Sequence, residues 1–126
     1  MKVKVTGKIN HQGNEYVKKL MKEVLVETAE ALKSDLQKSQ TMPFDTGALQ
    51  NRSTFVDASK KNNGIVKIVS YTPYARRLYF HPEYNFYKGH NKNAGGLWFE
   101  PYINGEKKDL ASKTYIKLMK GKLKWP

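Results

Sequence analysis

The segment from Glu15 to about Ser39 constrains the fold more than any other part of the chain, because its apolar residues recur every three or four positions. One broad face comprises Val17, Leu20, Met21, Val24, Leu25, Thr28, Ala31, Leu32 and Leu36. Charged residues occupy most of the remaining positions, so the spacing predicts a long amphipathic helix that packs one face into a core. Asn14 can cap its first turn, and Pro43 requires the helix to end earlier.

Three other segments predict a small antiparallel sheet. Residues 1–9 alternate cationic and apolar side chains around Val3 and Val5, the period of a half-buried strand, and we expect this strand at an edge. Residues 53–59 and 65–71 predict two more strands, joined by a turn at "KKNNG" into an antiparallel hairpin. On the last strand the alternation runs through Val66, Ile68 and Ser70.

The region after the hairpin is harder to interpret. "TPYARRLYF" is compatible with one helical turn at Tyr74–Arg77 or with a strand that continues to Phe80. Residues 80–98, which we call the arm, lack a regular period and are rich in aromatic residues, glycine, asparagine and lysine. Long irregular excursions of this kind usually serve function or contacts with neighbours.

The end of the chain predicts a second helix, from about Glu106 to Lys120, with Gly121 as its stop. The expected fold is therefore α+β, in which the long N-terminal helix packs on a small antiparallel sheet, followed by an extended aromatic loop and a C-terminal helix. A chain of 126 residues is long enough for one core of ordinary size, so we expect a single domain over residues 1–126.

The chain is strongly basic, with 23 Lys and Arg residues against 11 Asp and Glu residues and a net charge of +12. Such a potential attracts polyanions, namely nucleic acid, acidic proteins or anionic lipid. Cysteine is absent, which excludes disulfides and thiolate zinc sites and favours an intracellular protein. No apolar run approaches ~18 residues, and residues 1–10 do not resemble a signal peptide, so we expect no membrane span and synthesis in the cytosol.

The tripeptide Asp45-Thr46-Gly47 is the one on which aspartic proteases build a catalytic pair of carboxylates, about 3 Å apart. In those enzymes it follows an apolar strand, whereas here it follows the polar end of a helix. The preferred interpretation is a local one, in which Asp45 accepts hydrogen bonds from nearby backbone amides and shapes a loop.

A second candidate for chemistry lies in the arm, where His81, Glu83 and His90 stand among lysines. A small nuclease could use a histidine as general base with Lys88 or Lys92 on the phosphate, and the same three side chains could ligate zinc. Their spacing matches no helical or zinc-knuckle pattern, so exposed loop residues are the simpler interpretation. We therefore expect no catalytic residue, metal or cofactor.

Aromatic residues cluster between positions 74 and 102, interleaved with Arg77, Lys88 and Lys92. They are Tyr74, Tyr79, Phe80, Tyr84, Phe86, Tyr87, Trp98, Phe99 and Tyr102. Such rings can anchor a protein interface, complete the core of a small domain, or stack with single-stranded nucleic acid. The pattern alone leaves these three interpretations open.

Several strings together resemble a known family. "MPFDTGALQNRS", "YTPYARRLYFHPEYNFYKGHNKNAGGLWFEPYI" and the lysine-rich last helix are similar to the minor capsid proteins encoded in the head–tail joining region of tailed phages and prophages of low-GC Gram-positive bacteria. The wider group of neck and tail-completion proteins shares parts of this pattern. The matching positions are Asp45, Thr46, Gly47, Leu49, Pro73, Tyr74, Ala75, Phe99, Pro101 and Tyr102.

The resemblance, which covers residues 14–120, implies a non-enzymatic subunit that assembles as a homo-oligomeric ring in the virion neck. Its partners would be itself and the neighbouring head-closure and tail proteins, with non-specific contact to phage DNA, and it would reside in the host cytoplasm during assembly. The candidate subunit interface is Asp45, Thr46, Gly47, Leu49, Tyr74, Arg77, Phe86, Trp98 and Phe99. The alternative is a basic single-stranded nucleic-acid-binding protein or small nuclease that uses His81 and His90.

Overall fold

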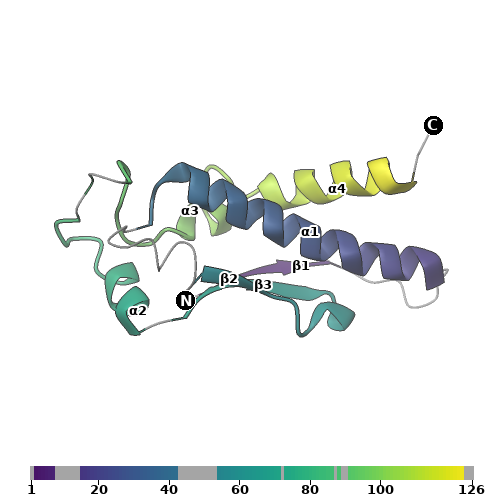
Figure 1. Ribbon diagram of the computed structural model, residues 1–126. Helices are drawn as coiled ribbons and strands as arrows, with labels where there is room; N and C mark the ends of the chain where they lie inside the picture. The colour runs from purple at the N-terminus through teal and green to yellow at the C-terminus, as the bar shows by residue number, and fades with distance from the viewer. Residues whose placement is uncertain are drawn as a thin grey trace.

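The computed structural model describes residues 2–7, 15–42, 54–71, 73–86, 88 and 91–123, although not the side chains of Pro73, Tyr74 and Leu123. Its elements are β1 (Lys2–Thr6), α1 (Glu15–Ser39), β2 (Thr54–Asp57), the short 3-10 helix η2 (Lys61–Asn63), β3 (Ile65–Ser70), α2 (Pro73–Tyr79), α3 (Glu100–Ile103) and α4 (Leu110–Leu123). The fold is α+β, as the sequence predicts, with a long N-terminal helix, a small antiparallel sheet and a C-terminal helix (Figure 1).

The sheet has the order β1-β3-β2, and both pairs are antiparallel. The predicted edge strand and the predicted hairpin are both confirmed. Gly64 connects η2 to β3 with φ of 74°, a left-handed conformation that glycine adopts without steric cost. The central strand β3 buries Val66, Ile68 and Ser70 and turns the alternate residues away from α1, as its period of two requires.

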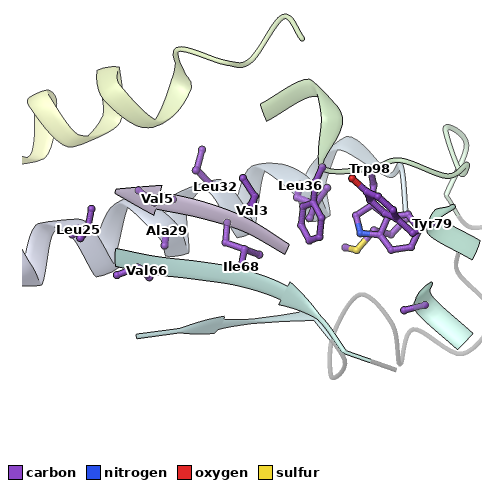
Figure 2. Close-up of a cluster of buried hydrophobic side chains, with 13 residues drawn as sticks. Val3, Val5, Leu25, Ala29, Leu32, Leu36, Val66, Ile68, Tyr79 and Trp98 are labelled. Carbon is purple, nitrogen blue, oxygen red and sulfur yellow. The ribbon is translucent and has the colours of Figure 1, made fainter. Parts of the chain in front are cut away.

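Helix α1 covers one face of this sheet, and α4 packs beside α1 on the same side (Figure 1). Figure 2 shows Val3 and Val5 from β1 and Val66 and Ile68 from β3, which belong to one buried cluster with Leu25, Ala29 and Leu32 of α1. The buried positions of the helix are Leu20, Val24, Leu25, Thr28, Ala29, Leu32 and Leu36. The predicted apolar face is therefore confirmed from Leu20 to Leu36 except that Ala31 is exposed and Ala29 takes its place in the core, while the predicted Val17 and Met21 are only half-buried.

Aromatic side chains fill the core beyond the C-terminal end of α1. The rings of Tyr79 and Trp98 meet edge to face with centroids 4.8 Å apart, and Phe99 lies 5.8 Å from Tyr79 (Figure 2). The indole Nε1 of Trp98 donates to Ser70 Oγ at 3.3 Å, and Ser70 Oγ also lies 2.9 Å from Thr54 Oγ1. These buried polar atoms satisfy one another, so the tryptophan has a fixed orientation against the sheet.

Two local predictions need adjustment. Residues Pro73–Tyr79 form the helix α2, so the helical interpretation holds and the strand interpretation is wrong. The last helix begins at Leu110, after the short helix α3, and continues through Gly121 to Leu123. The prediction that Gly121 stops the helix was wrong, because glycine within a helix costs only about 1 kcal/mol and does not by itself end one.

Candidate protein-interaction surface on α2 and the arm

The predicted interface residues fall into three groups. Asp45, Thr46, Gly47 and Leu49 lie outside the described residues, and so does the side chain of Tyr74. The loop-shaping role of Asp45 therefore stays a prediction.

Trp98 and Phe99 lie in the core. Their exposed fractions are 1% and 0%, so neither ring presents a surface that a partner could contact. Their positions follow from the packing of the arm against α1 and α2, which sequence spacing does not reveal. We therefore no longer include them in the candidate surface.

The second half of the arm is attached to the C-terminal end of α1, whose last carbonyl groups lack partners within the helix, and to the residues that directly follow it. The side-chain amide of Asn93 donates to Ser39 O at 2.9 Å, and that of Asn91 donates to Met42 O at 2.8 Å. The backbone amide of Gly95 adds a bond to Thr41 O at 3.0 Å. These bonds fix the return of the arm next to the helix end.

The arm also closes on α2. The Leu97 amide donates to Tyr79 O at 3.0 Å, and Gly96 packs against the same turn. A Cβ atom added to Gly96 would lie 2.9 Å from Tyr79 O and 3.0 Å from Leu78 O, so only glycine fits without a shift of the backbone. The two ends of the arm are therefore held side by side.

The end of α2 and the start of the arm carry a cluster that we call the arm surface: the exposed Arg76, Arg77, Phe80 and Tyr84 and the half-buried His81. The His81 and Tyr84 rings stack with centroids 4.6 Å apart and planes within 7°. The Arg77 guanidinium lies 6.0 Å from the centroid of the Tyr84 ring. Phe80 is 56% exposed at one side of this group, and Arg76, Arg77, Phe80 and His81 line a shallow depression.

Hydrogen bonds shift the pKa values of charged groups at and beside the arm surface. His81 Nδ1 lies 2.8 Å from Glu83 Oε1, and this bond lowers the pKa of the Glu83 carboxyl below its ordinary value. A side-chain hydrogen bond with Tyr84 raises the pKa of Arg77. The surface therefore presents two arginines and an exposed aromatic ring, with its acidic group engaged by the histidine.

Arginine and aromatic side chains are the residue types that most often carry the binding energy of protein interfaces. Arg77 and Phe86 were predicted there, and Phe86 is half-buried with its ring 6.5 Å from that of Tyr84. Phe80 and His81 were not assigned to the interface from the sequence. Phe80 directly follows Tyr79, the last residue of α2, and the helical angle turns adjacent side chains toward different sides.

The hypotheses of a histidine nuclease and of a zinc site gain nothing from the geometry. His90 lies outside the described residues. His81 and Glu83, the other two side chains of the hypothetical zinc site, are paired with each other. Among the residues that the structure describes, no three His, Asp or Glu side chains converge in a way that could hold a metal ion.

A deeper hollow of about 430 Å³ lies between β1 and α4, with Val5 and Leu25 on one side and Tyr115 on the other. Its ionisable neighbours include Lys4, Lys108 and Tyr102, but no carboxylate or histidine lines it. Among the described residues, the ionisable side chains that line this hollow are therefore those of lysine and tyrosine.

The lysine-rich last helix is partly engaged in ion pairs. Lys122 Nζ lies 3.1 Å from Glu27 and Lys107 Nζ lies 2.8 Å from Asp35, which joins α4 and its preceding turn to α1. Lys113 and Lys117 are exposed. This face therefore serves in part to hold α4 on α1.

Comparison of the chain with protein-family models, curated proteins and solved structures returned no match. Within the described residues, no helix combines the length and the apolar character needed to cross a bilayer.

Proposed function

We propose that this chain is a structural, non-enzymatic subunit of a phage or prophage head–tail joint, which assembles into a ring through the arm surface. The resemblance of its loop, arm and last-helix strings to minor capsid proteins suggests the class of assembly. The observation that carries the proposal is the exposed Phe80, which lies beside Arg76 and Arg77 at the start of the arm.

The arm surface is suited to contact with a protein. The aromatic side chain of Phe80 is 56% exposed and so contributes little to the stability of the monomer. A partner that covered it would gain the free energy of burying apolar area. The stacked His81 and Tyr84 rings are held by Glu83 and Arg77, so binding would order few additional side chains. A subunit of an oligomeric ring needs such an apolar contact residue because each copy must bind the next one.

The proposal can be tested by site-specific photocrosslinking of the full-length chain. A photoreactive phenylalanine analogue at position 80 should crosslink to a second copy, or to co-expressed head-closure and tail proteins, after irradiation. The matched control carries the analogue at position 116, because Ile116 is similarly exposed, at 52%, but lies on α4.

The expected result is crosslinking from position 80 and little or none from position 116. Sedimentation velocity of Phe80→Ala and Ile116→Ala should show that only Phe80→Ala loses the assembly. An exclusively monomeric chain that crosslinks to no co-expressed neighbour from position 80 would refute the proposed interface.

A further inference from the structure

The face of the sheet that points away from α1 combines lysines with apolar and aromatic side chains. We call it the outer face and define it by the residues that alternate with the buried ones along the three strands: Lys2, Lys4, Thr6, Phe55, Asp57, Ile65, Lys67 and Val69. Helices α1 and α4 both lie on the opposite side of the sheet, and no described element covers the outer face (Figure 1).

The lysines of this face are placed where they repel one another. Lys4 of β1 lies directly opposite Lys67 of β3, and like charges at such positions destabilise a sheet. Lys67 first, and then Lys4, lower the pKa of the neighbouring Lys2. Asp57, opposite Lys67, is the acidic residue within this ladder of described pairs. Asp57 offsets part of the repulsion at Lys67, but three lysines against one carboxylate leave this face positively charged, which suits an anionic ligand.

Apolar and aromatic groups lie beside these charges. Phe55 is directly opposite Val69 and is 40% exposed, while Lys2 flanks Val69 on its other side. Tyr71, two residues beyond Val69, is 75% exposed. β3 ends at Ser70, so Tyr71 lies just beyond the strand, next to the end of the outer face where Phe55 and Val69 pair.

A ligand that offered phosphates alone would leave the exposed aromatic side chains of this face without a partner. A duplex presents phosphates and grooves to a flat surface and keeps its bases stacked inside, so Phe55 and Tyr71 would gain little from it. The unpaired bases of a single strand offer free faces that stack on aromatic side chains. Protein interfaces are depleted in lysine, which makes an acidic protein a poorer fit for this face.

We propose that the outer face binds single-stranded nucleic acid, with phosphates on Lys2, Lys4 and Lys67 and bases on Phe55 and Tyr71. This interaction is separate from the proposed ring assembly and does not depend on it. The two surfaces share no residue, so either proposal can fail alone.

The electrostatic part can be tested by the fluorescence anisotropy of a labelled oligothymidylate of about 12 nucleotides, within the usual range of site sizes. The wild-type chain should bind it, and Lys4→Gln/Lys67→Gln should bind it more weakly. The dependence of log K on log salt should become less steep by about 0.7 for each phosphate that the variant no longer neutralises. The matched control, Lys113→Gln/Lys117→Gln, removes the same charge from exposed positions on α4 and should keep the wild-type slope.

The same lysine variant also separates binding from folding. Because it removes both the repulsion between Lys4 and Lys67 and the attraction between Lys67 and Asp57, its urea midpoint should stay close to that of the wild type. An equal decrease of the slope in the α4 control would show general attraction to a basic protein and would overturn the proposal. So would the absence of binding by the wild-type chain.

The aromatic part is tested by Phe55→Leu and Tyr71→Leu, which keep apolar side chains and remove the rings. Each should weaken binding of the single strand by roughly fivefold or more, since stacking on one base contributes about 1 kcal/mol or more. Binding to a duplex of equal length should not change. A duplex that binds at least as tightly as the single strand, or ring variants that bind normally, would overturn the assignment.

Discussion

Tyr79 and Phe80 are adjacent in the chain, and their rings lie 5.0 Å apart, yet they belong to two different parts of the molecule. Tyr79 is 6% exposed and packs with Trp98 and Phe99, whereas Phe80 is 56% exposed and belongs to the arm surface. The difference comes from the end of α2, which turns one ring toward the core and leaves the next outside. One run of aromatic residues can therefore supply both a core and an interaction surface.

The largest effect is expected from the buried group. Trp98→Ala should lower the free energy of unfolding by about 3–5 kcal/mol, because it leaves a large cavity beside Tyr79 and the sheet. Urea denaturation followed by circular dichroism measures this loss. A loss below about 1 kcal/mol would mean that the indole is not part of a packed core and would remove the distinction between the two groups.

A smaller loss is expected from the hydrogen bonds behind the tryptophan. Ser70→Ala should cost about 1–3 kcal/mol, because it leaves both Trp98 Nε1 and Thr54 Oγ1 buried without this partner. The same denaturation measurement applies. Ser112→Ala is the control, since Ser112 is exposed on α4 and should change stability by no more than about 0.5 kcal/mol.

Tyr102 is intermediate in burial between Tyr79 and Phe80. Its ring is half-buried, and its hydroxyl donates to Asp35 Oδ2 at 2.7 Å. Burial alone would raise the pKa of Asp35, but the hydrogen bonds from Lys107 and Tyr102 outweigh it and lower that pKa. The carboxylate therefore stabilises the fold above its unfolded pKa of about 4, and this contribution is lost as the pH falls through the lower folded value.

The measurement is the urea midpoint of wild type and Asp35→Asn between pH 7 and pH 2. The difference in the free energy of unfolding between the two proteins should be at most about 1 kcal/mol at pH 7, since the carboxylate is partly exposed. It should shrink toward the acid end of the range. A difference that is constant over the whole range would show that the charge of Asp35 contributes nothing.

The smallest effect on stability is expected at the exposed ring. Phe80→Ala should change the free energy of unfolding by no more than about 0.5 kcal/mol, because little of its surface is buried in the monomer. Its thermal midpoint should therefore stay near that of the wild type. A loss as large as that of Trp98→Ala would place Phe80 in the core and undo the contrast with Tyr79.

The long helix and the strands could be predicted from the sequence because each has an uninterrupted period, whereas the short helices α2 and α3 span too few residues to show one. The heptad-like spacing from Leu20 to Leu36 predicts the buried face of α1, and the alternation of Val66 and Ile68 predicts that of β3. Ala29 and Ala31 were exchanged because alanine is small enough to occur on either side of a helix, so its hydrophobicity says little about its orientation.

The candidate site was harder to predict because it depends on contacts between distant segments. Trp98 is buried through its bond to Ser70, and the arm is fixed by asparagines that reach the end of α1. No local period records such contacts. The outer face was missed for a related reason: the opposition of Lys4 and Lys67 exists only once the register of β1 against β3 is known.

The closure of the arm at Gly96 and Leu97 has a consequence for how such a surface can diversify. Because the stretch from Asn91 to Leu97 is tied to α2 and to the end of α1, the length and composition of the exposed turn at residues 82–85 can change without rebuilding the core. Doubling the length of a closed loop costs only about 0.6 kcal/mol in entropy. The scaffold can therefore exchange one binding specificity for another through insertions at a single site, and the same site is a natural place to graft an affinity tag or a foreign epitope.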